Sequence, residues 1–210
     1  MIIEHLAVGP LACNCTIIGD REGGDAIVVD GGDEVDRIVA VLAKHRLTAR
    51  FLVHTHAHFD HIGALGDLRE QTGARGLLHH GDLPLYAMLR EQALMFGLTP
   101  PRLVNLDADL REGETVRAGD VSLGVLHTPG HTPGSVTFSL ERHDGTTLLT
   151  GDTLFRGAIG RWDLGGTSME DIVSSIRSKI LVYDDATVVV PGHGPSTTVG
   201  TERANNPFLV

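Results

Sequence analysis

Short apolar runs recur along the chain, and each one ends in polar residues. The segments AIVVDGG and TTLLTGDT lead to Asp30 and Asp152, and three others end near histidines. Runs of Val, Leu and Ile that stop at a loop with Gly or Pro are typical of β-strands buried on both faces. We therefore predict a strand at the start of each of the segments AIVVDGG, RFLVHTHAHFDH, VSLGVLHTPGHTPGS, TTLLTGDT and TVVVPGHGP.

Amphipathic helical patterns occupy intervals between these runs. Apolar residues recur at i, i+3, i+4 and i+7 in the first and last quarters of the chain, as on one face of a helix. Thr167 and Glu170 have the spacing of a capping box, and Asp82 followed by Pro84 predicts a helix start with Asp82 as N-cap. The expected helices comprise residues 34–45, 63–71, 82–96 and 168–179.

Strands buried on both faces need packed layers beside them, so we expect the helices to flank the sheet. No linker, low-complexity segment or shift in composition interrupts residues 1–210, which predicts a single domain. Aromatic residues make up only 4% of the chain, so the core must consist mainly of Val, Leu and Ile.

Charge and composition argue against several classes of function. The formal net charge is -10 with only 17 Lys and Arg residues, which disfavours nucleic-acid binding. The N-terminus MIIEHLAVGP lacks a signal-peptide pattern, and no apolar run approaches the roughly 20 residues of a membrane span. We therefore expect a cytoplasmic protein with no membrane partner. Cys13 and Cys15 are too few and too close together for a disulfide framework, and we interpret them as small buried residues.

The candidate chemistry is concentrated in HTHAHFDHIG, residues 54–63. Neutral imidazoles bind borderline metals such as zinc, and a carboxylate adds charge for a second cation. His56 and His58 can converge on one ion, whereas Asp60 and His61 can face a neighbouring ion. Three more ligands are needed, and other strand ends supply them. The resulting assignment has His56, His58 and His131 on one metal ion, Asp60, His61 and His193 on the other, and Asp152 bridging both.

Two such ions, roughly 3.5–4 Å apart, would share a water whose pKa falls to about 7, which gives a hydroxide at neutral pH. Asp60 and Asp152 are the candidate catalytic carboxylates within this set. The donors favour zinc as the divalent metal, with iron or manganese as alternatives. The competing interpretation is a solvated polar loop with scattered core histidines, but it does not explain the ordered matches at four separate strand ends.

The segments HTHAHFDHIG, HTPGHTPGS, LLTGDTLF and VVPGHGP together resemble the metallo-beta-lactamase superfamily, in the same order and over nearly the whole chain. The resemblance implies an α+β fold, a four-layer αββα sandwich with the metal ions at one edge. Within the superfamily, GDTLFRGAIGRWDLGGTSMEDI and the ending PGHGPSTTVGTERANNPFLV are similar to short, single-domain glyoxalase II-type hydrolases, also called hydroxyacylglutathione hydrolases.

Departures from other branches of the superfamily narrow the reaction that the resemblance implies. Flavodiiron proteins have a glutamate in place of His58, and acyl-homoserine lactonases usually have a histidine in place of Ser135. What remains is hydrolysis of a glutathione thioester, such as S-D-lactoylglutathione to D-lactate and glutathione. A thiolate leaving group, whose thiol has a pKa of about 8.5, needs little help from a general acid. The alternatives are an iron-dependent glutathione persulfide dioxygenase, with His56, His131 and Asp152 as iron ligands, and a non-catalytic metal-binding module.

Residues around the proposed ligands have two interpretations each. Asp30, at a strand end, either accepts an N–H from a ligand histidine or serves as a turn residue. Arg161 stands where two-domain glyoxalase II enzymes have a lysine that contacts glutathione, so it either binds a substrate carboxylate or pairs with Asp163. We expect His54 to be hydrogen-bonded without a direct role. The apolar residues of 82–96 either line a substrate groove or face the core.

Overall fold

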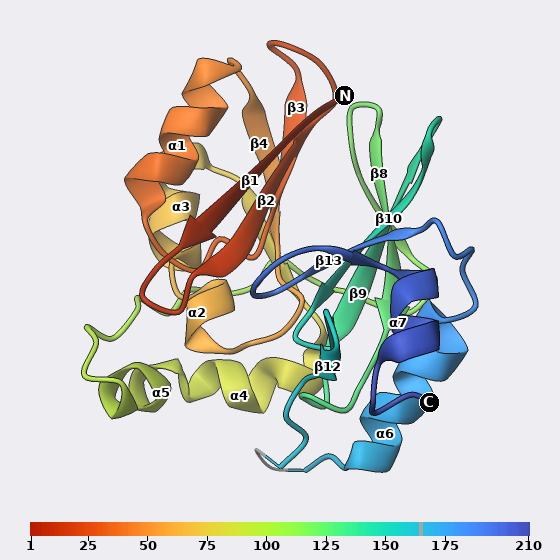
Figure 1. Ribbon diagram of the computed structural model, residues 1–210. Coiled ribbons are helices and arrows are strands. Elements are labelled where there is room, and N and C mark those ends of the chain that lie inside the picture. Colours follow the sequence, from red (N-terminus) through yellow and green to blue (C-terminus); the bar gives the residue numbers. More distant parts are fainter. Residues whose placement is uncertain (164–165) are drawn as a thin grey trace.

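The computed structural model describes residues 1–163 and 166–210, and it contains two β-sheets stacked face to face (Figure 1). The first sheet comprises, in spatial order, β1 (Ile2–Val8), β2 (Cys13–Gly19), β3 (Asp25–Val29), β4 (Thr48–Val53), β5 (Arg75–Leu78) and β6 (Ala108–Asp109). The second comprises β14 (Thr197–Thr198), β13 (Val188–Pro191), β10 (Gly145–Gly151), β9 (Val136–Arg142), β8 (Val121–His127) and β7 (Thr115–Ala118). A small separate ribbon pairs β11 (Leu154–Phe155) with β12 (Ala158–Ile159).

Helices cover the outer face of each sheet (Figure 1). The helices between strands of the first sheet are α1 (Val35–Lys44), α2 (Phe59–Ile62), α3 (Leu65–Thr72), η1 (His80–Asp82), α4 (Leu83–Ala87) and α5 (Leu89–Met95). Of these, α1 and α3 lie over the outer face, and α4 and α5 run along the lower edge of the sandwich in Figure 1. The second sheet is covered by α6 (Met169–Ser175), its π-helical continuation η2 (Ile176–Ile180) and α7 (Val199–Asn205). In the two described ranges, no helix has both the length and the apolar character needed to cross a membrane.

Three buried hydrophobic clusters hold these layers together. Ile38 of α1 and Leu52 of β4 belong to the cluster between the first sheet and its helices. Ile27 of β3 and Phe138 of β9 belong to the cluster between the two sheets. Ile172 of α6 packs in the third cluster with residues of β10 and β13. The predicted four-layer αββα sandwich is confirmed, and every strand expected from the apolar runs is present.

Helix α6 begins at Met169 after the N-cap Ser168, within one residue of the predicted start, but its capping box lies one residue later than expected. Ser168 is the N-cap, with its hydroxyl oxygen accepting the Asp171 N–H at 3.1 Å, and the Asp171 carboxylate accepts the Ser168 N–H at 2.9 Å. The prediction of a Thr167–Glu170 capping box was wrong. Ser168 and Asp171 have the same three-residue spacing, so the sequence pattern alone does not distinguish the two pairs. Ser168 has the extended backbone that an N-cap requires, with φ -135° and ψ 164°.

Residues 82–96 form two short helices, so the prediction of one helix was wrong. Met88, between α4 and α5, has φ -97° and ψ 12° and interrupts the helical path. Asp82 precedes α4, yet its side chain makes no capping hydrogen bond and turns toward other loops. Tyr86 is buried, whereas Met88 and Phe96 are more than half exposed, so these residues do not all face the core. Their place in a substrate groove stays a prediction.

Parallel pairing places the motif residues at one edge of the sandwich. β3, β4 and β5 are parallel neighbours in the first sheet, and β10 and β13 are parallel neighbours in the second. Because the carboxyl ends of parallel strands meet at the same edge of a sheet, the residues that follow these strands converge. An isolated bridge between Cys13 and His193, with a 2.7 Å hydrogen bond from Asn14 N–H to the Gly192 carbonyl, links the two sheets there.

The observed capping box makes a prediction that separates it from the expected one. Substituting Ser168→Ala should lower the free energy of unfolding by about 1 kcal/mol, because the Asp171 N–H loses its acceptor. Glu170→Ala, in the same helical turn, should change it by a few tenths of a kcal/mol. Urea unfolding followed by circular dichroism measures both, and a larger loss in Glu170→Ala would contradict the assignment.

Candidate metal centre

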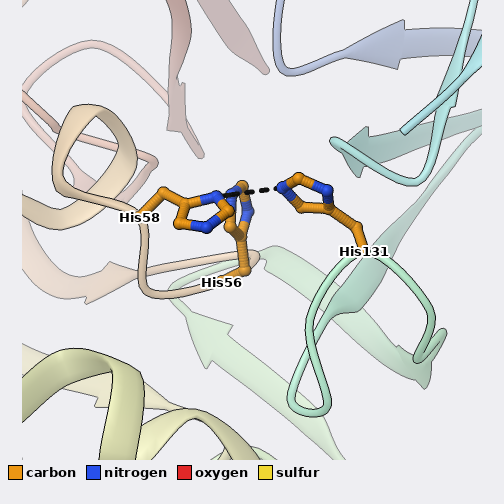
Figure 2. Close-up of side chains that lie close together, drawn as sticks. All are labelled: His56, His58 and His131. Atoms are coloured by element: carbon orange, nitrogen blue, oxygen red, sulfur yellow. Dashed lines mark hydrogen bonds between the residues drawn. The ribbon is translucent and has the colours of Figure 1, made fainter. Parts of the chain in front are cut away.

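Three histidines from two loops point ring nitrogens at one another (Figure 2). His56 and His58 follow β4, and His131 lies in the loop between β8 and β9. His56 Nε2 lies 3.0 Å from His58 Nδ1, which lies 2.9 Å from His131 Nε2. Burial, and next the neighbouring imidazoles, lower the pKa of His58 to about 3 and that of His56 well below its usual value. The rings are therefore neutral at pH 7, which is the form that binds metal ions.

A second group of donors lies beside the first. Asp60 and His61 are in α2, and His193 follows β13. His193 Nε2 lies 3.1 Å from Asp60 Oδ2 and 3.2 Å from His61 Nε2. Burial acts to lower the pKa of His193, but the carboxylates of Asp60 and Asp152 outweigh it and raise that pKa. The ligand atoms of the three residues lie within 4.8 Å of one another, close enough to share one ion.

Asp152, directly after β10, lies between the two groups. Its Oδ1 is 3.3 Å from His61 Nε2, and its Oδ2 is 3.6 Å from His131 Nε2. Burial would raise the pKa of Asp152, but the histidines, His61 above all, hold it well below its usual range. Oδ1 is buried and has no hydrogen-bond partner. A carboxylate oxygen withdrawn from water without a donor is costly, and a bound cation would satisfy it.

The outward nitrogens of the rings are held so that the inward nitrogens remain free to bind. His131 Nδ1 lies 2.8 Å from the Arg161 carbonyl, and His193 Nδ1 lies 3.0 Å from the Leu11 carbonyl. Because a carbonyl only accepts, each Nδ1 must carry a proton, and in the neutral ring the lone pair is therefore on the Nε2 that faces the centre. The same donor chemistry makes these residues fit a pair of divalent ions.

Asp30 holds two of the rings in the same way, directly and through Thr55. Its Oδ2 lies 3.1 Å from His61 Nδ1 and accepts the Thr55 hydroxyl at 2.8 Å. The Thr55 oxygen, whose proton is used, then accepts the His56 Nδ1–H at 3.1 Å. Thr55 was missed by sequence reasoning, because a threonine between two histidines carries no distinguishing signal.

Backbone groups and glycines around the centre also escaped sequence reasoning. The carbonyls of Leu11 and Arg161 belong to loops that only the tertiary fold brings to the histidines. Gly192 lies so close to Asp152 and His61 that any side chain there would collide with both.

Cys13 is buried with Sγ 3.5 Å from His61 Nδ1, and burial raises the pKa of its thiol to about 11. Such a thiol is neutral at pH 7.

Two predicted neighbours lie outside the ring of donors. The Arg161 guanidinium is exposed and pairs with Asp163 through contacts of 2.9 and 3.0 Å. His54 is fully buried, with Nδ1 3.0 Å from the His61 carbonyl and Nε2 without a partner among the described residues. Burial lowers the pKa of His54 to about 4.

The lowered pKa of His54 predicts a pH-dependent loss of stability. The unfolded chain binds a proton near pH 6.5 that folded His54 excludes until about pH 4. The contribution of His54 is therefore fully present above pH 6.5 and is lost as the pH falls toward 4. Between pH 7 and 4, wild type should lose on the order of 3 kcal/mol more than His54→Gln, measured by urea unfolding. Parallel stability curves for the two proteins would contradict this assignment.

Comparison with known proteins agrees with this geometry. The sequence profile of the Metallo-beta-lactamase superfamily matches residues 8–193. Hydroxyacylglutathione hydrolase GloC of Haemophilus influenzae is 37% identical over 216 residues, which cover 100% of this chain and 98% of the relative.

Two crystal structures are similar over the same length. BLEG-1 B3 metallo-beta-lactamase superposes with a TM-score of 0.90 at 32% identity, covering 100% of both chains. TTHA1623 in a di-iron-bound form superposes with a TM-score of 0.87 at 37% identity, covering 98% of this chain and 100% of the other. The chain therefore belongs to the metallo-beta-lactamase superfamily, whose members are generally metal-dependent hydrolases.

Proposed function

We propose that this protein is a dinuclear metal-dependent hydrolase of glutathione thioesters, which converts S-D-lactoylglutathione to D-lactate and glutathione. The observation that carries the proposal is the unpaired, buried Asp152 Oδ1 between two groups of inward-facing donors. The substrate class is supported by the similarity to hydroxyacylglutathione hydrolase GloC along the full chain. The chain would act as a single hydrolase domain in the cytoplasm.

In this proposal, the seven residues divide as the sequence predicts. His56, His58 and His131 would hold one divalent ion, Asp60, His61 and His193 the second, and Asp152 both. Zinc is the ion that we favour, and iron or manganese would suit the same nitrogen and oxygen donors. When bound, such a pair supplies Lewis acidity and a water of lowered pKa.

The chain's own residues would prepare this chemistry. The carbonyls of Arg161 and Leu11 hold a proton on Nδ1 of His131 and His193, so that Nε2 is the nitrogen available to a metal ion, and Asp30 orients His61. The leaving group is a thiolate, because glutathione has a thiol with a pKa of about 8.5. Its departure therefore needs no proton from a side chain, which agrees with a donor set in which the histidines carry lone pairs inward.

Arg161 is the residue that we propose for substrate binding. Its backbone carbonyl contacts His131, so the residue lies at the rim of the proposed centre, and its side chain is 68% exposed. A glutathione carboxylate has the same geometry as the Asp163 carboxylate with which the guanidinium now pairs in two contacts. Replacing the Asp163 carboxylate by a glutathione carboxylate at the guanidinium would therefore cost little free energy.

Steady-state hydrolysis of S-D-lactoylglutathione tests the reaction. Metal-loaded wild type should turn the thioester over, and Asp152→Ala should lose bound metal and at least about a hundredfold in kcat/KM together. Absence of turnover above the metal-free protein would reject the substrate. Oxygen uptake with glutathione persulfide at one iron per chain would instead support the dioxygenase, β-lactam hydrolysis would support a lactamase, and metal binding without turnover would support a non-catalytic module.

A separate prediction concerns Arg161. Arg161→Ala should raise KM for the glutathione thioester about tenfold and leave kcat within about twofold. The reason is that the lost ion pair would stabilise the bound substrate and the transition state equally. Arg142→Ala is the matched control, since Arg142 also pairs with a carboxylate two residues away but lies at the opposite end of β9 from the centre. Equal kinetic effects in the two variants would show that Arg161 has no role in binding.

A further inference from the structure

Asp82 is a fully buried carboxylate, and its partners are distant from it in sequence. Its Oδ2 accepts the Ala57 N–H at 2.9 Å and the Thr132 hydroxyl at 2.8 Å, and its Oδ1 accepts the Gly134 N–H at 2.6 Å. Three donors in good geometry satisfy both oxygens of a carboxylate that would otherwise be very costly to bury. Asp82 therefore joins three segments of the chain.

These partners adjoin the three histidines of the first group. Ala57 lies between His56 and His58, and Thr132 follows His131. The first loop extends from β4 of one sheet and the second joins β8 to β9 of the other. A single carboxylate thus connects the two loops that place His58 Nδ1 2.9 Å from His131 Nε2.

Small residues make this contact possible. The α-carbon of Gly134 lies so close to Asp82 that an added Cβ would be 2.7 Å from the carboxylate carbon. At Gly81 an added Cβ would be 3.0 Å from the Gly134 α-carbon and from the Pro133 carbonyl. The segment before α4 and the His131 loop are therefore packed backbone against backbone, with no room for a side chain.

Gln92 of α5 holds the other side of the same peptide. Its Nε2 donates to the Ala57 carbonyl at 3.2 Å and to the Leu85 carbonyl at 2.9 Å, and its Oε1 accepts the Phe59 N–H at 3.1 Å. Both polar groups of Ala57 are thus bound by side chains from one segment, its N–H by Asp82 and its carbonyl by Gln92.

We propose that Asp82 is a positioning residue for the first metal site, with Gln92 as its partner, and that residues 80–96 serve to hold the His56–His58–His131 triad. The proposal rests on the metal-binding function proposed above. It distinguishes the two sites, because the hydrogen bonds of Asp82 go to the loops of the first group and to none of Asp60, His61 and His193.

The isosteric change Asp82→Asn tests the proposal through metal affinity. Its amide oxygen can accept at one of the two oxygen positions, and its NH2 must then face a backbone N–H at the other. Either the Ala57 N–H or the Gly134 N–H therefore loses its acceptor, which weakens the connection between the two loops. We expect one of two Co²⁺ sites to bind about 10–100-fold more weakly, with the other unchanged, in titrations followed by visible absorption. The spectrum of the weakened site should also change, which a general loss of stability would not produce.

Glu202→Gln is the matched control. Glu202 of α7 is also a buried carboxylate with three donors, namely Gly157 N–H, Asn206 Nδ2 and the Thr197 hydroxyl, at 2.8, 2.8 and 2.6 Å. It contacts neither loop of the triad through these bonds. Its substitution should lower the free energy of unfolding without changing either Co²⁺ affinity.

The outcomes separate the two proposals. Wild type that binds no Co²⁺ would reject the metal-binding function itself. Wild type with two sites, together with Asp82→Asn that keeps both affinities or loses both equally, would reject only the positioning role. Should Asp82→Asn not fold, Thr132→Val removes one donor and keeps the carboxylate. It should weaken the same single site several-fold, and unchanged binding would overturn the proposal.

Discussion

The buried carboxylate of Asp152 is the constraint on which the rest of this molecule depends. One of its oxygens is out of contact with water and has no hydrogen-bond donor among the described residues. Burying an anion in that state costs several kcal/mol unless a positive charge compensates it. Asp152 and its neighbouring carboxylates raise the pKa of His61 and of His193, so these two rings compensate part of the charge in the absence of metal. A bound cation would take over this role and would satisfy Oδ1 directly.

The sandwich architecture brings histidine and aspartate side chains to Asp152 because its two sheets meet at one edge. Each sheet contributes carboxyl ends of parallel strands, and neither sheet alone supplies a complete group of donors. Direct backbone contacts, from Asn14 to Gly192 and from Val136 to Thr55, link the sheets there at 2.7 and 2.8 Å. Glycine at position 192 lets the loop after β13 approach Asp152 and His61 without a clash. The positions of the ligand atoms thus follow from packing between sheets, and the loops have little freedom of their own.

The segment at residues 80–96 shows where local reasoning fails. An aspartate followed by a proline and apolar residues has the same local pattern whether its side chain caps a helix or reaches across the fold. In this chain Asp82 reaches across to three donors on two loops and makes no capping hydrogen bond to its own helix. The helical periodicity of the segment correctly indicated helix, but the helix is divided into α4 and α5 because the backbone at Met88 leaves the helical conformation. Capping boxes that differ by one residue are likewise equivalent until the backbone angles are known.

The order of the layers was implied by the resemblance to the superfamily, whereas the sequence by itself determined the positions of β3, β4, β8, β10 and β13 and the residue types at their ends. These follow from local periodicity and from the small number of side chains that bind metal ions. The tertiary structure alone decided which nitrogen of each ring faces the centre. That choice depends on the carbonyls of Leu11 and Arg161, the carboxylate of Asp30 and the hydroxyl of Thr55. It also decided that the Asp82 carboxylate bonds to two loops distant from it in sequence. Hydrogen bonds between residues far apart in the chain leave no periodic trace in it, so only the folded structure could reveal them.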